Sequence, residues 1–197
     1  MKTALLLSRF GRCERGGAAE FALILPLFIL LFVGLIDAGL FFYEVNRGEK
    51  ATQIGARMAV VTNPVAPDLS TKNYVGEMVG GVTLTQGDRI PASALGTITC
   101  NNSSCSSLGY DSAAFTNLLT RMRQIMPRIQ ASNLIIEYRG SGLGYAGNPN
   151  GMDISPLVTV RLTGLTFAPT VLFGAQLNLP DFAYTLTMED GQGTGSN

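Results

Sequence analysis

Residues 16–43 read GGAAEFALILPLFILLFVGLIDAGLFFY, and this stretch decides the fold of the chain. From Phe21 to Tyr43, Asp37 is the one charged residue. A helix needs about 20 apolar residues to cross the hydrocarbon core of a bilayer, which is about 30 Å thick. We therefore expect residues 18–43 to form a transmembrane helix. The alternative, a buried helix in the core of a soluble protein, is ordinarily shorter and less uniformly apolar.

The charges on either side of the apolar run predict its direction across the membrane. Residues 1–17 carry four basic residues and one acid, whereas the charges that follow Tyr43 balance. Lys and Arg are enriched on the cytoplasmic side of membrane helices, so we expect residues 1–17 to be a cytoplasmic leader and the chain beyond Tyr43 to lie outside. A secretory signal peptide fits poorly, because its apolar part spans only about 7 to 15 residues and ends in small residues.

Three residues inside or beside the run are unusual in a membrane helix. Pro26 removes one backbone hydrogen bond, so we expect a kink near it. A carboxylate at the centre of a membrane helix costs about 2.5 to 3.5 kcal/mol, and less toward the ends. We expect Glu20 to pair with another subunit. For Asp37 two interpretations stay open, contact with headgroups or water and pairing with another subunit.

The helix is expected to continue beyond the membrane as an amphipathic extension over residues 44–62. Small residues spaced by four, Gly34 with Ala38 and Gly55 with Ala59, permit close approach of another helix. Pro64 disfavours helical geometry in the residue before it, so the helix should end near Asn63.

Residues 63–110 form a loop-rich connection, with short strands expected near 81–85 and 95–100. Its distinctive feature is the pair Cys100 and Cys105, which the predicted topology places outside the cytoplasm, where disulfides persist. A structural disulfide is the leading interpretation. A zinc site would need about four Cys or His ligands, and Cys13 is the one cysteine left. A thiol redox pair is the other alternative, although the spacing is not Cys-x-x-Cys.

Residues 111–190 predict a helix followed by a small antiparallel sheet, which gives an α+β fold. The helix should begin at the N-cap candidate Asp111 and stop before Pro127. Alternating apolar and polar residues predict strands over 133–139, 155–163 and 182–188. The apolar segment 165–179 either packs on the sheet or forms an exposed patch. Residues 191–197 are glycine-rich and are expected to be a disordered tail.

The composition argues against several classes of function. The formal net charge is zero, which gives no electrostatic reason to expect a nucleic-acid partner. The chain has no histidine, and it carries no phosphate-binding glycine loop, nucleophile elbow or histidine-based triad. We therefore expect neither enzymatic activity nor a cofactor or metal.

The ordered features of the N-terminal region resemble the TadE family of pseudopilin-like proteins of tight-adherence pili. The resemblance runs to the sequence GARMA at residues 55–59 and is carried by Gly16, Glu20, Phe21, Pro26, Asp37 and Gly39. It implies a single-pass protein of the bacterial inner membrane, with its C-terminal domain periplasmic or extracellular and its N-terminal helix packed against a C-terminal sheet. The implied partners are other pilus or pseudopilin subunits, the inner-membrane assembly platform and membrane lipid.

The resemblance also implies processing by a prepilin peptidase, which cuts after a glycine and leaves the glutamate as the fifth mature residue. Here the spacing is one residue shorter. A cut after Gly16 would make Glu20 the fourth mature residue, and a fifth-position Glu20 would need a cut after Arg15. The candidate processing residues are Gly16, Gly17, Glu20 and Phe21.

These observations lead us to expect a minor pseudopilin that takes part in assembly or initiation of a tight-adherence pilus or a related secretion filament. The residues expected to mediate intramembrane pairing and helix packing are Glu20, Pro26, Gly34, Asp37, Ala38 and Gly39. The alternative is a stand-alone tethered domain that binds an external ligand or the cell wall. Co-purification with pilin-like partners would distinguish the two.

Overall fold

The computed structural model describes residues 14–170, 175–189 and 191–195. Most of the expected leader, residues 1–13, therefore lies outside the described residues, as do Val171, Leu172 and Phe173 of the apolar segment. The chain divides into two compact units, which are described separately. The first unit holds residues 1–43 and 167–177, and the second holds residues 44–166 and 178–197.

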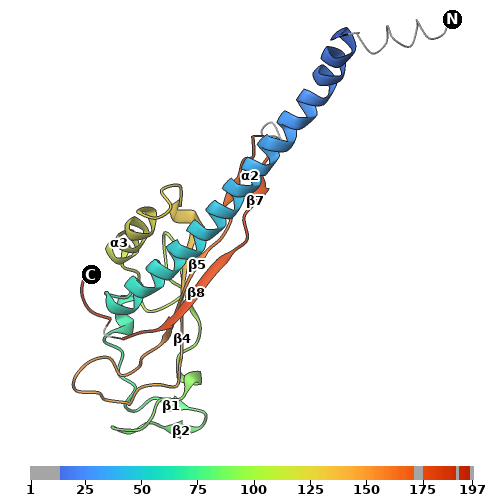
Figure 1. Cartoon of the computed structure of the whole chain (residues 1–197). Coiled ribbons are helices and arrows are strands. Elements are labelled where there is room, and N and C mark those ends of the chain that lie inside the picture. The colour runs from blue at the N-terminus through green and yellow to red at the C-terminus, as the bar shows by residue number, and fades with distance from the viewer. Residues whose placement is uncertain (1–13, 171–174, 190, 196–197) are drawn as a thin grey trace, which may run out of the picture. The chain divides into compact units, whose positions relative to one another are not determined.

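Helix α2 (Glu14–Val61) is the longest element described, with 48 residues (Figure 1). Pro26 lies inside this helix without ending it. The helix stops at Val61, three residues before Pro64, as the restriction that proline places on the preceding residue predicts. The α+β fold predicted from the sequence, with a long apolar N-terminal helix, one further helix and small antiparallel sheets, is confirmed.

The second unit is built on a four-stranded antiparallel sheet of order β3-β4-β5-β8. Its strands are β3 (Ile98–Cys100), β4 (Leu134–Arg139), β5 (Leu157–Leu162) and β8 (Phe182–Thr187). The alternation in β4 puts Leu134, Ile136 and Tyr138 in the core, because successive side chains point to opposite faces of a strand. On the other face, Arg161 pairs with Glu137 across the strands at 3.2 Å.

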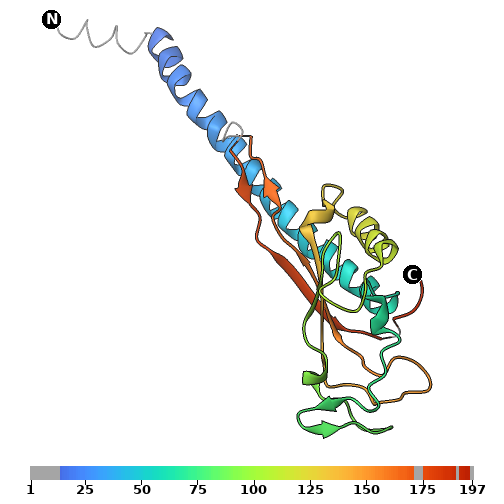
Figure 2. The same ribbon diagram turned by 180° about the vertical axis from the view of Figure 1, so that it is seen from behind.

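The extension of α2 is the central core element of the second unit. Its small residues Ala51, Ala56 and Ala59 are buried. A side chain added at Gly48 would meet the Phe182 ring, with the ring carbon Cζ at 2.7 Å, and one added at Gly55 would meet Sδ of Met122 at 2.7 Å. Residues 44–61 therefore pack closely on strand β8 and helix α3 (Ser112–Arg123) (Figures 1 and 2).

Helix α3 begins where the sequence predicts. Asp111 is its N-cap, and its Oδ1 accepts hydrogen bonds from the backbone N–H groups of Ala113 and Ala114 at 2.8 and 3.1 Å. These bonds satisfy donors that have no partner inside the helix. The buried face of the helix is formed by Phe115, Leu118, Leu119 and Met122.

Several short elements were not predicted. They are the two-residue strands β1 (Met78–Val79), β6 (Thr166–Phe167) and β7 (Leu177–Asn178), and the 3-10 turns η1 (Pro67–Leu69), η2 (Ala92–Ala94) and η3 (Ala131–Asn133). The two-residue strand β2 (Val82–Thr83) lies within the strand expected near residues 81–85. β1 pairs with β2 and β6 pairs with β7. In the tail expected to be disordered, the carbonyl oxygen of Gly193 accepts a hydrogen bond from the backbone N–H of Asn63 at 2.8 Å. The backbone N–H of Gly193 donates to Oδ1 of the Asn63 side chain at 2.9 Å.

Asp153 clamps two loops of the second unit together. Its carboxylate is 6% exposed and accepts hydrogen bonds from the backbone N–H groups of Tyr74, Gly147 and Asn148, at 2.8, 2.9 and 2.9 Å. Hydrogen bonds to a charged group are stronger than neutral ones, and a buried donor left without a partner is costly. The sequence presents Asp153 as one available carboxylate among several, and the structure gives it a folding role.

We predict that Asp153→Ala lowers the free energy of unfolding of the second unit by about 3 kcal/mol, because three backbone donors lose their acceptor. Chemical denaturation of the detergent-solubilised chain measures this. The matched control is Asp88→Ala, which removes an exposed carboxylate that accepts hydrogen bonds from Thr85, and its effect should be much smaller. Equal effects of the two substitutions would contradict the clamp.

Candidate functional site

Most of the apolar half of α2 is exposed, apart from the side around Asp37. Among the large side chains that are exposed, the exposed fraction ranges from 38% at Leu25 to 79% at Leu23, whereas Phe41 is half-buried. Among the described residues, this is the helix long and apolar enough to cross a membrane, within Glu20–Val61. Water solvates such a surface poorly, so the surface needs lipid or other helices around it. The structure is thus consistent with the expected single-pass membrane anchor.

The glycines of α2 differ between its two halves. Those in the second unit, Gly48 and Gly55, have side chains of Phe182 and Met122 where a Cβ would be. In contrast, a Cβ at Gly34 or Gly39 would meet no atom within 4 Å. The small residues beyond the membrane run are therefore explained by packing inside this chain. Gly34 and Gly39 are not, although Gly34 also lines a groove formed with the chain's own Phe167, Pro169 and Leu177. The open space at both glycines permits close approach of a neighbouring helix.

The other helix-packing residues predicted from the sequence are distributed along the same run. Glu20 is exposed at its beginning, and Ala38 is exposed beside Asp37. Pro26 lies on the helix between Glu20 and Ala38, and Gly39 follows Ala38. Pairing of Glu20 with another subunit stays a prediction.

Asp37 lies in an environment that the sequence did not indicate. It is 7% exposed and lines a groove of about 340 Å³ between the helix, from Gly34 to Phe42, and residues Phe167, Pro169 and Leu177. The rings of Phe41 and Phe167 meet edge to face with centroids 5.8 Å apart. Both sides of this groove belong to the first unit. To the two environments expected for Asp37, the structure adds contact with the chain's own apolar segment.

An ion-pair cluster fixes the start of the helical extension in the second unit. Arg128 pairs with Glu44 at 3.0 Å, and Arg47 pairs with Glu44 at 3.6 Å. Arg47 also donates two hydrogen bonds to the carbonyl oxygen of Ile125, from Nε at 2.9 Å and from Nη2 at 2.6 Å. Arg128 therefore holds the turn after α3 against α2, in addition to standing on a solvated face.

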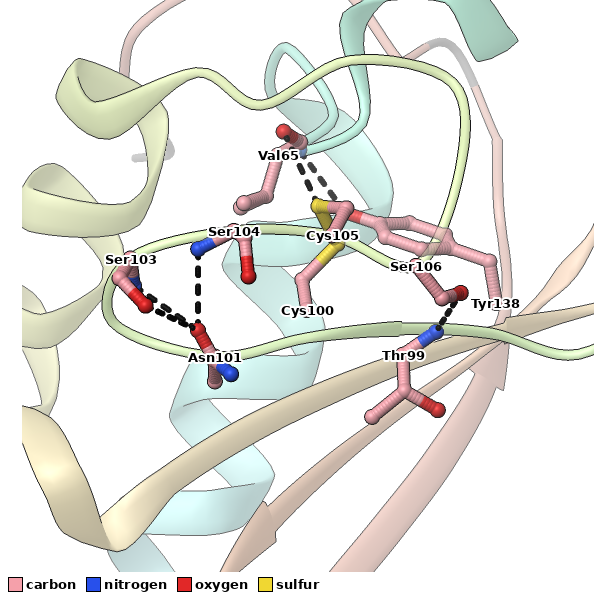
Figure 3. Close-up of a disulfide and its surroundings, with 9 residues drawn as sticks. All are labelled: Val65, Thr99, Cys100, Asn101, Ser103, Ser104, Cys105, Ser106 and Tyr138. Atoms are coloured by element: carbon pink, nitrogen blue, oxygen red, sulfur yellow. Dashed lines mark hydrogen bonds between the residues drawn. A yellow bond between two sulfur atoms is a disulfide. The ribbon is translucent and has the colours of Figure 1, made fainter.

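Cys100 and Cys105 form the expected disulfide, which closes a turn after β3 (Figure 3). Oδ1 of Asn101 organises the turn by accepting hydrogen bonds from the backbone N–H groups of Ser103 and Ser104, both at 2.9 Å. Sγ of Cys105 lies 3.7 Å from the carbonyl oxygen of Val65. The bridge thus fastens β3 beside the chain that leaves α2.

Tyr138 also binds Val65, through the backbone N–H group rather than the carbonyl oxygen. Its hydroxyl oxygen accepts a hydrogen bond from the backbone N–H of Val65 at 2.9 Å (Figure 3). Burial raises the pKa of the Tyr138 phenol well above its ordinary value, so the hydroxyl stays protonated. This buried hydrogen bond holds Val65, just after the end of α2, against Tyr138 of strand β4.

Within the described residues, no group of three or more His, Cys, Asp or Glu side chains is placed to hold a metal ion.

We predict that replacing Cys100 and Cys105 by serine makes residues 100–105 sensitive to protease and leaves membrane insertion unchanged. The loss of loop closure should lower the free energy of unfolding by about 2 kcal/mol. Limited proteolysis of membranes, followed by mass mapping of the cleavage sites, measures this. The control is Cys13→Ser, which should leave the cleavage pattern unchanged. An unchanged pattern in the double variant would argue against a structural bridge.

Comparison with known proteins gives one result for this chain. No curated protein and no solved structure matches it. A family model described as TadE-like protein matches residues 16–57. The match starts at Gly16, covers the exposed apolar run and ends in the part of α2 that packs inside the second unit. The resemblance predicted from the sequence is confirmed over this segment, and the N-terminal region of the protein is TadE-like.

Proposed function

We propose that this protein is a membrane-anchored minor pseudopilin that takes part in assembly or initiation of a tight-adherence pilus or a related secretion filament. One observation carries the proposal. The segment that matches the TadE-like model, residues 16–57, includes the apolar surface that this chain leaves uncovered. An exposed apolar helix needs lipid or other apolar helices around it. In the proposed pseudopilin, α2 contacts both.

The proposed orientation has residues 1–17 in the cytoplasm and the second unit outside. Two sequence features support it. The basic residues are concentrated before the apolar run, as they are on the cytoplasmic side of membrane helices. The Cys100–Cys105 disulfide suits an oxidising compartment such as the periplasm.

The proposed mechanism is association between subunits in the plane of the membrane. Glu20 is exposed at the cytoplasmic end of the run, where an unneutralised carboxylate favours an oppositely charged partner. Gly34 and Gly39 allow the backbone of a second helix to approach closely. The partners would be other pilus subunits and the inner-membrane assembly platform.

We predict that Gly39→Leu leaves folding and membrane insertion intact and strongly reduces co-purification of pilin-like partners. The reason is that a Cβ at Gly39 has no atom of the described residues within 4 Å, so a loss of association reports a contact with another molecule. Co-purification from detergent extracts and counting of pili on complemented deletion cells measure the two effects.

Two controls accompany Gly39→Leu. Gly96 also has open space around a built Cβ, so Gly96→Leu should preserve association. Gly55→Leu should instead destabilise the second unit, because Met122 occupies the space. If extracts of the unaltered protein retain no pilin-like partner and deletion leaves piliation intact, the assembly role fails and a stand-alone tethered domain takes its place.

Processing by a prepilin peptidase is a separate part of the proposal. We predict a cut after Gly16, which leaves Gly17 as the first residue and Glu20 as the fourth. Intact-mass analysis of the membrane-extracted protein measures it, and Gly16→Leu should prevent the loss of mass. A chain that still begins at Met1 in cells with an active peptidase contradicts processing and leaves the other parts of the proposal standing.

A further inference from the structure

We propose that residues 167–170 and 175–177 enter the outer half of the bilayer beside α2, so that the protein contacts lipid through two elements of its chain. The inference rests on the proposed membrane-spanning role of α2. We call these two stretches the apolar arms.

The apolar arms pack on the membrane-spanning run itself. Phe167, Pro169 and Leu177 form one side of the groove, and the other side is helix from Gly34 to Phe42. Phe167 and Pro169 are buried there, and their neighbours Ala168 and Thr170 face outward. This period of two is that of an extended chain with one face on the helix. Whatever surrounds residues 34–42 therefore also surrounds the outward face of the arms.

The depth of the arms follows from the geometry of the helix. The middle of the run from Phe21 to Tyr43 is Phe32. At a rise of about 1.5 Å per residue, Gly34 lies about 3 Å and Phe42 about 15 Å from that middle along the axis. Half of a hydrocarbon core is about 15 Å thick. Phe41, which contacts Phe167, lies about 13 to 14 Å out, which is close to the boundary between acyl chains and headgroups.

The chemistry of the segment suits that depth. No charged residue occurs between Arg161 and Asp181, so no ion has to leave water. The outward side chains of the arms are small or uncharged, namely Ala168, Thr170, Ala175 and Gln176. The amphipathic ring of tyrosine is favoured at the membrane interface, and Tyr43 follows Phe41 and Phe42 at this end of the run.

The backbone of the arms limits how deeply they can lie in the bilayer. Irregular backbone does not face acyl chains in the hydrocarbon core, because its N–H and C=O groups would lack partners. Pro169 has no N–H group and is buried, and a position near the headgroups gives the remaining groups access to water.

The arms also change the surroundings of Asp37. A carboxylate in contact with acyl chains is costly, and Asp37 is only 7% exposed in the groove that the arms close. Lipid is the occupant that we assign to the outward face, because the face is continuous with the exposed surface of the run, where Leu35 and Ile36 are 63% and 60% exposed.

The test uses the full chain in phosphatidylcholine vesicles, with a fluorescent NBD group on a single introduced cysteine. The background is Cys13→Ser without reductant, so that the Cys100–Cys105 disulfide stays closed. The test positions are Thr170→Cys and Ala175→Cys, both at exposed sites. Leu31→Cys, in the run, is the membrane control, and Ser93→Cys, exposed in the second unit, is the solvent control.

We expect blue-shifted emission at positions 170 and 175, with quenching by shallow doxyl lipids at least twofold stronger than at 93. Position 31 should be quenched best by deep doxyl lipids. Solvent-like emission at 170 and 175 with quenching at 31 overturns the inference and leaves the membrane span intact. Blue-shifted emission without lipid quenching also overturns it, since protein such as a second copy then covers the arms. Loss of quenching at 31 removes the membrane span and the inference together.

Discussion

The structure depends on one constraint, the inability of water to cover the apolar surface from Phe21 to Tyr43. Nearly all of the large side chains in this stretch are exposed, and the described part of the chain covers one side of it only, at the groove around Asp37. Lipid and neighbouring helices are the surroundings that remove this surface from water. The run from Phe21 to Tyr43 therefore requires lipid or helices of other molecules around it.

The same helix meets the opposite demand beyond Tyr43. There its glycines and alanines let sheet and helix approach closely, with Phe182 at Gly48 and Met122 at Gly55. One continuous α2 thus has mostly exposed large apolar side chains before Tyr43 and buried small residues where its own domain surrounds it. This division gives physical meaning to the TadE-like match, because the matched residues 16–57 include both parts.

Elements with strong local patterns could be predicted from the sequence. The apolar run, the Asp111 cap of α3 and the alternating strands β4, β5 and β8 are signalled by composition, capping chemistry and period. The short strands β6 and β7 could not be predicted, since two residues carry no period. Their importance comes from Phe167 and Leu177, whose contact with the helix near Asp37 joins residues more than 120 positions apart. The folding role of Asp153 could not be predicted either, because the three backbone N–H groups that it binds come from two loops distant in the sequence.

The glycine positions of α2 also have a mechanical consequence. In the filament role that we propose, α2 would carry load along its axis. Within the second unit, an axial pull on α2 cannot simply slide the helix past its neighbours, because the Phe182 ring and the Met122 side chain sit in the gaps at Gly48 and Gly55. The Phe182 and Met122 side chains would have to move at the same time. The hydrogen bonds from Val65 to Tyr138 and from Gly193 to Asn63 add resistance just beyond the C-terminal end of α2. The load is thus shared in shear among many contacts, and the domain would yield at a force set by all of them acting at once.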